Sequence, residues 1–174
     1  MQSRKKDSTS VRKSEPPGDY ESVKEAALRL LERRPRTRTD LLRRLGQSGV
    51  EAGLADEVVG RLAEVGLISD VQVAAQVVRE ELRKGSGNSR IRQKLSQAGV
   101  GSEEIHAAME DLPPEIERAL EVGSKRAGRV SSGGRRDAQK RLGSFLQSKG
   151  FGFETVSQAV ALLLDEVEAE VTVA

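Results

Sequence analysis

Apolar residues recur at helical spacing from Tyr20 almost to the C-terminus. Side chains three or four residues apart lie on one face of an α-helix, so each such pair or triplet marks a helix. They are Leu28 and Leu31, Leu41 and Leu45, Val58 with Leu62 and Val65, Val73 and Val77, Ile91 and Leu95, Ile105 and Met109, Leu142 and Leu146, then Val156, Val160 and Leu164. No two-residue alternation typical of a β-strand competes with them. Because glycine and proline separate these stretches, the pattern predicts an all-α protein of about nine short helices.

Capping residues indicate where two of these helices begin. Thr37 and Asp40 fit a Thr-x-x-acidic start, in which the Thr37 side chain accepts an otherwise unpaired backbone N–H of the first turn. Asp70 is expected to cap the helix that follows Leu67 and Ile68.

The chain repeats itself with a period of about 50 residues. An offset of 50 places Leu41, Leu45 and Gly49 onto Ile91, Leu95 and Gly99, and a further offset of 51 reaches Leu142, Leu146 and Gly150. A glycine there suits a helix C-terminus that needs a left-handed residue, and the apolar residue after it can fold back onto the helix. Between Gly49 and Val58, the first repeat has three more residues than its counterparts. Each unit is predicted as helix, turn, helix, glycine turn, helix.

The repeat divides the chain into a tail and three units. We expect residues 1–19 to be a disordered tail, because they contain too few apolar side chains to order themselves. Three-helix repeats are expected over residues 20–66, 67–112 and 113–168. Apolar residues form 36% of the chain and charged residues 32%, which suits small helical units with wide solvated faces. The expected fold is therefore all-α, with three tandem three-helix repeats in an elongated arrangement.

Charge follows the same period, although the net charge is only +2. Residues 29–44 contain seven arginines, residues 79–94 six basic residues, and residues 125–149 eight. The third helix of each unit is acidic, as at Glu57, at Glu103 with Glu104, and at Asp165. A single basic run usually marks a solvated helix face. Three runs in register predict a basic stripe for a long anionic partner, either nucleic acid or a filament that contains it.

Composition also bears on compartment and chemistry. The chain has no cysteine, no apolar run near the ~20 residues of a membrane span, and no signal-peptide apolar stretch after Arg4 to Lys6. These features predict a cytoplasmic protein. His106 is the only histidine, and the glycine-rich stretches at Gly85 to Gly87 and at Gly133 match no phosphate-binding loop. We expect flexible turns there, and a binding protein rather than an enzyme, with no cofactor and no metal ion.

One stretch resembles a known family. Gly66-Leu67-Ile68-Ser69-Asp70, then Val73, Ala74, Val77, Arg79, Gly85, Arg90, Ile91 and Leu95, closing with Gly99 and Val100, is similar to the signature of RecX, the bacterial modulator of the RecA recombinase. Ala27-Leu28 with Leu31 and Arg33, and Lys149-Gly150-Phe151, resemble the first and third repeats of that family. The resemblance runs from about Tyr20 to Asp165. Two positions depart from it: Val73 stands where the family usually has an aromatic residue, and Lys94 where it often has an acid.

The resemblance implies a curved protein that lies in the groove of a RecA filament on single-stranded DNA and opposes filament growth. It would thereby restrain recombination and the SOS response. Separately from the resemblance, we expect a monomer, and the lack of a long apolar run predicts no membrane partner. The residues expected to face the filament or nucleic acid are Arg43, Arg44, Arg79, Arg83, Lys84, Arg90, Arg92, Lys94, Lys140 and Arg141. The acidic third helices are expected to meet basic surfaces of RecA. The alternative is an independent nucleic-acid-binding protein with helix-turn-helix-like repeats.

Overall fold

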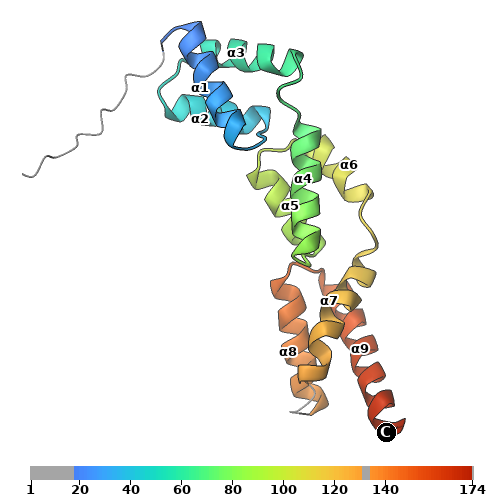
Figure 1. Cartoon of the computed structure of the whole chain (residues 1–174). Coiled ribbons are helices and arrows are strands. Elements are labelled where there is room, and N and C mark those ends of the chain that lie inside the picture. The colour runs from blue at the N-terminus through green and yellow to red at the C-terminus, as the bar shows by residue number, and fades with distance from the viewer. Residues whose placement is uncertain (1–17, 131–133, 174) are drawn as a thin grey trace, which may run out of the picture.

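The computed structural model describes residues 18–130 and 134–173, and over these residues the chain forms nine helices and no strand (Figure 1). They are α1 (Tyr20–Arg33), α2 (Arg38–Gln47), α3 (Ala52–Glu64), α4 (Asp70–Arg83), α5 (Asn88–Gln97), α6 (Ser102–Glu110), α7 (Glu115–Val130), α8 (Arg135–Ser148) and α9 (Phe153–Val173). The all-α prediction is confirmed, although α9, with 21 residues, is not short. Of the predicted tail, residues 1–17 lie outside the described residues, and Asp19 caps α1 by accepting the Ser22 N–H.

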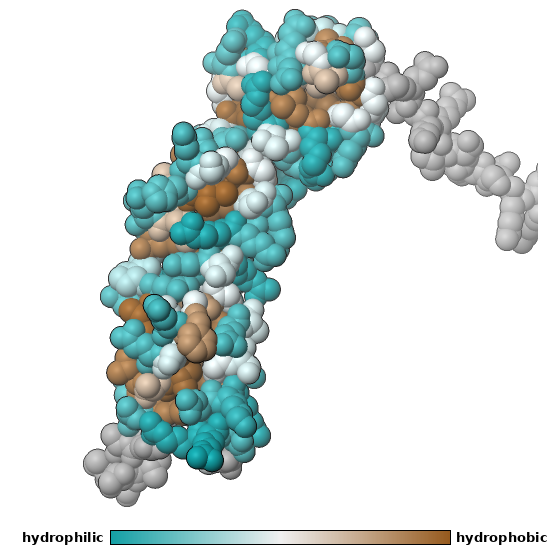
Figure 2. Space-filling model, turned by 180° about the vertical axis from the view of Figure 1, so that it is seen from behind, coloured by the Kyte–Doolittle hydropathy of each residue, from teal (hydrophilic) through white to brown (hydrophobic). Residues whose placement is uncertain are grey.

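Three consecutive three-helix units each have their own core. Leu45, Leu95 and Leu146 occupy the same place in the three cores, and their exposed fractions are 1%, 0% and 0%. In Figure 1 the units follow one another in an elongated arrangement, and the first is set at an angle to the other two, so the molecule bends. Figure 2 shows the opposite face, where apolar side chains gather in a separate patch on each unit. The predicted repeat is confirmed.

The second helix of every unit ends in the predicted glycine turn. Gly49, Gly99 and Gly150 have φ of 85°, 79° and 87°, the left-handed conformation that glycine adopts without steric cost. The residue after each glycine is buried, and its N–H donates to the carbonyl oxygen five residues earlier, as from Val100 to Leu95 at 3.1 Å. This is the Schellman arrangement, and it turns the chain back over the helix that it has just left.

The predicted difference in length between the first unit and the others is wrong. Helices α3, α6 and α9 all begin three residues after the glycine of the turn, at Ala52, Ser102 and Phe153. The counterpart of Ile105 is therefore Ala55, which is buried with 3% exposure. A buried alanine fills this core position, and the apolar pattern of larger residues begins one turn later at Val58.

Consecutive units join through one type of contact, used twice. The first turn of a unit's second helix sits on the glycine turn of the next unit. Between units one and two, the Thr37 hydroxyl donates to the Ala98 carbonyl oxygen at 2.8 Å and also accepts the Asp40 N–H, which confirms the predicted cap. Between units two and three, the Gly87 N–H donates to the Lys149 carbonyl oxygen at 2.9 Å. The predicted flexible turn at Gly85 to Gly87 is thus a packed junction, in which Ser86 is buried.

A carboxylate from the next unit completes each junction. The Arg38 N–H donates to Asp70 Oδ1 at 3.0 Å, and the Asn88 N–H donates to Glu115 Oε1 at 2.6 Å. Both acids are the first residues of their helices, and each places negative charge at the positive N-terminus of a helix in the preceding unit. The prediction that Asp70 caps its own helix is therefore wrong. That role belongs to Ser69, whose hydroxyl accepts the Gln72 N–H.

Among the helices of the described residues, none is both long and apolar enough to cross a membrane. The same residues contain no group of three or more histidine, cysteine or acidic side chains that could hold a metal ion.

Candidate functional site

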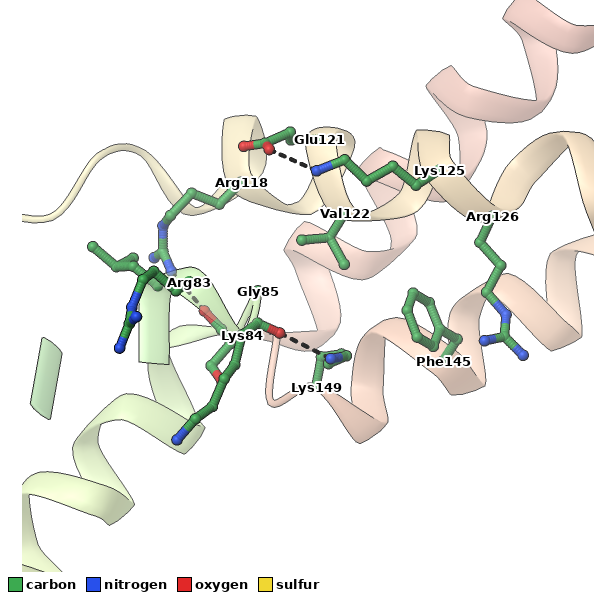
Figure 3. Close-up of a pocket in the computed structure, with 12 residues that line it drawn as sticks. Arg83, Lys84, Gly85, Arg118, Glu121, Val122, Lys125, Arg126, Phe145 and Lys149 are labelled. Carbon is green, nitrogen blue, oxygen red and sulfur yellow. Dashed lines mark hydrogen bonds and ion pairs between the residues drawn. The ribbon is translucent and has the colours of Figure 1, made fainter. Parts of the chain in front are cut away.

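A pocket of about 370 Å³ lies at the junction of the second and third units, where the end of α4 meets α7 and α8 (Figure 3). We call it the basic cleft, because six of its lining side chains are cationic: Arg83, Lys84, Arg118, Lys125, Arg126 and Lys149. Glu121 is the acidic residue in the lining, and Phe145 supplies an aromatic ring. The cleft thus combines an excess of positive charge with one aromatic surface.

The floor of the cleft depends on the way α4 ends. Gly85 has a φ of 68°, and a methyl group added there would lie 2.7 Å from a methyl carbon of Val122 on α7. Only a residue without a side chain lets α7 approach this closely. The preceding residue, Lys84, donates to Glu81 at 2.7 Å, and Glu81, which is buried, also accepts from the Ser86 hydroxyl at 2.7 Å. Burial raises the pKa of Glu81, but these two hydrogen bonds outweigh it and the pKa is lowered.

Arg118 locks α7 onto the second unit. Its guanidinium donates to the Ser86 carbonyl oxygen at 2.8 Å, to the Pro113 carbonyl oxygen at 3.1 Å, and to the side chain of Asn88. Burial lowers the pKa of Arg118, and the charge of Glu115 opposes this shift. Since most of its donors are used within the chain, Arg118 builds the cleft rather than offering a free cation.

The opposite wall carries the aromatic ring. Phe145 and Lys149 are four residues apart on and just after α8, so they lie on one face. The Arg126 guanidinium lies 4.5 Å from the centre of the Phe145 ring, and the Lys149 ammonium lies 5.9 Å from it. Both distances are within the range of cation–π attraction. Figure 3 shows Arg126 beside Phe145 at one end of the cleft, with Arg83 and Lys84 at the other.

Several of the cleft's cations have no acidic partner. Lys125 pairs with Glu121 at 2.9 Å, and Lys84 pairs with Glu81. Within the part of the chain that the structure describes, Arg83, Arg126 and Lys149 form no ion pair. Unneutralised cations from three helices around one pocket suit an anion with several oxygens, such as a phosphodiester.

The ten residues predicted for the interface do not gather in one place. Arg83 and Lys84 line the basic cleft, whereas Arg79 lines a separate groove between α4 and α6. Arg90 lies at the edge of the junction, where it donates to the Ser148 carbonyl oxygen at 3.1 Å. The remaining positions of the middle and third units are exposed on α5 and α8: Arg92, Lys94, Lys140 and Arg141.

In the first unit, Arg43 and Arg44 surround a buried acid. Both donate to the Asp40 carboxylate. Arg36 also donates to it, from Nη1 to Oδ2 at 2.6 Å, and Arg36 and Asp40 are each only 7% exposed. Burial alone would raise the pKa of Asp40, but the three arginines outweigh it and lower the pKa to about 2. Part of the positive charge predicted for this unit's interface is therefore balanced inside the unit.

The prediction missed four cations of the cleft. Lys125, Arg126 and Lys149 belong to a basic run that was recognised, yet nothing in the run separates them from its other members. The sequence contains one indication of the cleft: Phe145 stands four positions before Lys149, which predicts an aromatic ring and a cation on the same helix face. Arg118 is identified only by the tertiary structure.

Comparisons with known proteins agree over the whole array. Family models match residues 24–62 as the first three-helix domain of RecX, 69–109 as the second and 114–160 as the third. The chain is 37% identical to the regulatory protein RecX of Halorhodospira halophila over 142 residues, which is 81% of this chain and 88% of the relative. It is also 37% identical to RecX of Chromohalobacter salexigens over 136 residues, covering 78% and 88% of the two chains.

A solved structure shares the fold. The crystal structure of RecX from Lactobacillus salivarius matches with a TM-score of 0.74 at 23% identity, covering 83% of this chain and 96% of that one. The agreement of three consecutive domain models, full-length relatives and the helical array leads to one conclusion: the chain belongs to the RecX family of regulatory proteins.

Proposed function

We propose that this protein is a negative regulator of RecA that binds in the groove of the RecA filament on single-stranded DNA and opposes filament growth. In the cytoplasm, this binding restrains recombination and the SOS response. The relatives named above are regulatory proteins, which supports regulation as the general role. The observation that carries the proposal is the basic cleft between the second and third units.

The cleft is better suited to a phosphodiester chain than isolated surface cations are. Arg83 ends α4, Arg126 lies on α7 and Lys149 directly follows α8, so the packed junction fixes the relative positions of their backbones. Each cation that neutralises a phosphate releases condensed counterions, and the affinity gained this way depends on salt. Because the backbones that carry these cations are already in place, no rearrangement of the units is needed when the ligand binds.

The three tandem units extend the proposed binding surface beyond the cleft. Helical repeats in tandem present an extended surface on which weak contacts act together. Arg43 and Arg44 in the first unit, Arg92 in the second, and Lys140 and Arg141 in the third are the additional contacts that we propose along a filament. A partner that is itself long and helical would engage several of these positions at once.

Charge reversal at two cleft residues tests the proposal. Arg83→Glu combined with Arg126→Glu should weaken binding to the RecA-coated strand and abolish inhibition of RecA-driven strand exchange. The slope of log affinity against log salt should fall by about one unit per lost phosphate contact. The matched control is Arg29→Glu combined with Arg33→Glu, which reverses two exposed arginines of α1 that, like Arg83 and Arg126, form no ion pair within the described residues. If the cleft variant keeps its helical circular dichroism and inhibits as well as the control, the cleft is not the binding site.

The alternative function, independent binding of nucleic acid, is favoured by one feature of the cleft. Phe145 is only partly buried, and a base could stack on an aromatic ring beside cations. Binding to naked single-stranded DNA and to the RecA-coated strand should be compared at one salt concentration. Tighter binding to the coated strand supports the RecA proposal, and equal or weaker binding supports the alternative.

A further inference from the structure

The middle unit has a less complete core than its neighbours. Helix α3 contributes four buried residues to the first core, whereas α6 contributes none to the second. Ile105, Ala108 and Met109 of α6 are only partly buried, although they occupy the positions that face the unit. The side of the middle unit between α4 and α6 is therefore open.

A groove of about 520 Å³ follows this opening, within the range of pockets that hold ligands. Its floor is made of small apolar side chains, Ala74 and Ala75 from α4 with Ala107 and Ala108 from α6. Val71 stands at one end with 67% of its surface exposed. Because these side chains are small, they leave room in the groove for larger side chains from outside. An exposed apolar groove of this kind is typical of sites where an amphipathic segment docks.

The rim of the groove is mainly acidic. Glu103, Glu104 and Asp111 contribute three carboxylates, and Arg79 contributes the one cation. Among the residues that the structure describes, none of these four takes part in an ion pair. An apolar floor within an acidic rim is complementary to an apolar side chain that is flanked by basic residues.

Two other occupants fit the groove poorly. Nucleic acid would bring phosphates against three carboxylates. A second copy of this chain would offer its exposed large apolar residues, and within the described residues each of these stands near an acid: Val65 follows Glu64, Leu67 and Val71 lie near Asp70, Phe153 precedes Glu154, and Leu162 lies near Asp165. The rim would repel both.

We propose that this groove docks a segment of a partner protein in which an apolar side chain is flanked by lysine or arginine. The proposal rests on the proposed function in one respect, that the partner is the recombinase. The two functional faces then have different chemistry: the basic cleft binds the anionic strand, and the acidic groove holds a basic, apolar segment of the protein that coats it. The groove would therefore allow the protein to distinguish a protein-coated strand from naked DNA, which has no such segment.

A peptide titration followed by ¹⁵N–¹H NMR tests the groove without RecA. The probe is a 12-residue peptide with a leucine-rich centre and arginines on both sides, compared with versions that have glutamate flanks or a serine-rich centre. The first peptide should shift the amides of Val71, Ala75 and Ala107, and the other two should bind about tenfold more weakly or not at all. Equal binding of all three peptides, or no shifts at these amides, overturns the proposal.

A matched pair of variants links the groove to the filament. Ala107→Arg places a bulky cation in the groove at an exposed helical position, and Ala161→Arg makes the same change on α9. Arginine is a good helix former, so both should keep the wild-type circular dichroism and melting midpoint. The first should bind the peptide and the RecA-coated strand about tenfold more weakly while binding naked DNA normally. The second should match the wild type.

The outcomes separate the two proposals. If the wild type does not bind the RecA-coated strand, the proposed function fails, while the peptide titration still decides the groove. If Ala107→Arg loses the peptide but binds the coated strand normally, recombinase as the partner is overturned. A wild type that sediments as a dimer and an Ala107→Arg variant that sediments as a monomer would assign the groove to a second copy and overturn the proposal.

Discussion

Gly87→Ala should separate the second and third units while leaving their individual cores intact. Gly87 has a φ of −80°, which alanine adopts without strain, so the effect of the added methyl group is steric. That methyl would lie 2.3 Å from the Phe151 amide nitrogen and 2.4 Å from the Gly150 carbonyl carbon. Ordinary contacts begin at 3.4 Å, so the two backbones must move apart by about 1 Å.

This movement would break the hydrogen bonds from the Gly87 and Ser89 N–H groups to the Lys149 and Gly150 carbonyl oxygens, now 2.9 and 3.1 Å long. A backbone hydrogen bond contributes ~0.5–1.5 kcal/mol net, so their loss amounts to about 1–3 kcal/mol. Hydrogen exchange of the two amides should accelerate, and urea unfolding of the full chain should shift to lower concentration. Gly46→Ala is the control, because a methyl group there meets nothing within 4 Å. Unchanged exchange at Gly87 and Ser89 would refute the junction described above.

Two further predictions concern the cores and the buried acid. Leu95→Ala, at a fully buried position in the middle unit, should reduce the free energy of unfolding by ~2–5 kcal/mol in urea titrations, and an equally stable variant would contradict the core assignment. Asp40→Asn should destabilise the first unit at neutral pH. Since the pKa of Asp40 is lowered from 3.8 to about 2, the contribution of its charge is complete above about pH 4 and is lost as the pH falls through 2. The wild type should therefore exceed the variant by roughly 2 kcal/mol more at pH 6 than near pH 2, and a constant difference would show that the ionised carboxylate is not responsible.

Local features were predictable from the sequence because their causes are local. The helical spacing, the Thr37 cap and the left-handed glycines depend on residues within a few positions of one another, and the structure confirms all three. The repeat was predictable because the same local pattern occurs three times. The repeat was misaligned only at Ala55, because a buried alanine in the core cannot be distinguished in the sequence from alanines on exposed helix surfaces.

Contacts between units were not predictable in the same way. The sequence places Asp70 beside a helix start, and only the tertiary structure shows that its carboxylate binds the Arg38 N–H of the preceding unit. The basic cleft was not predictable for the same reason: a junction between units places Arg83, Arg126 and Lys149 around one pocket. Charge counts identified the basic runs, but they could not show which cations are balanced internally, as Arg44 is by Asp40.

The junction between units has a consequence for how such a chain can change in length. The middle unit carries both halves of the contact: Asp70 and the Gly99 turn meet the unit before it, and Gly87 and Asn88 meet the unit after it. A tandem copy of this unit would therefore find complementary partners on both sides. Duplication of the first or third unit would leave at least one new boundary without its matching half. A four-unit chain made by doubling residues 67–112 should fold as a longer array, and the basic cleft would still form once, where the last copy meets α7 and α8.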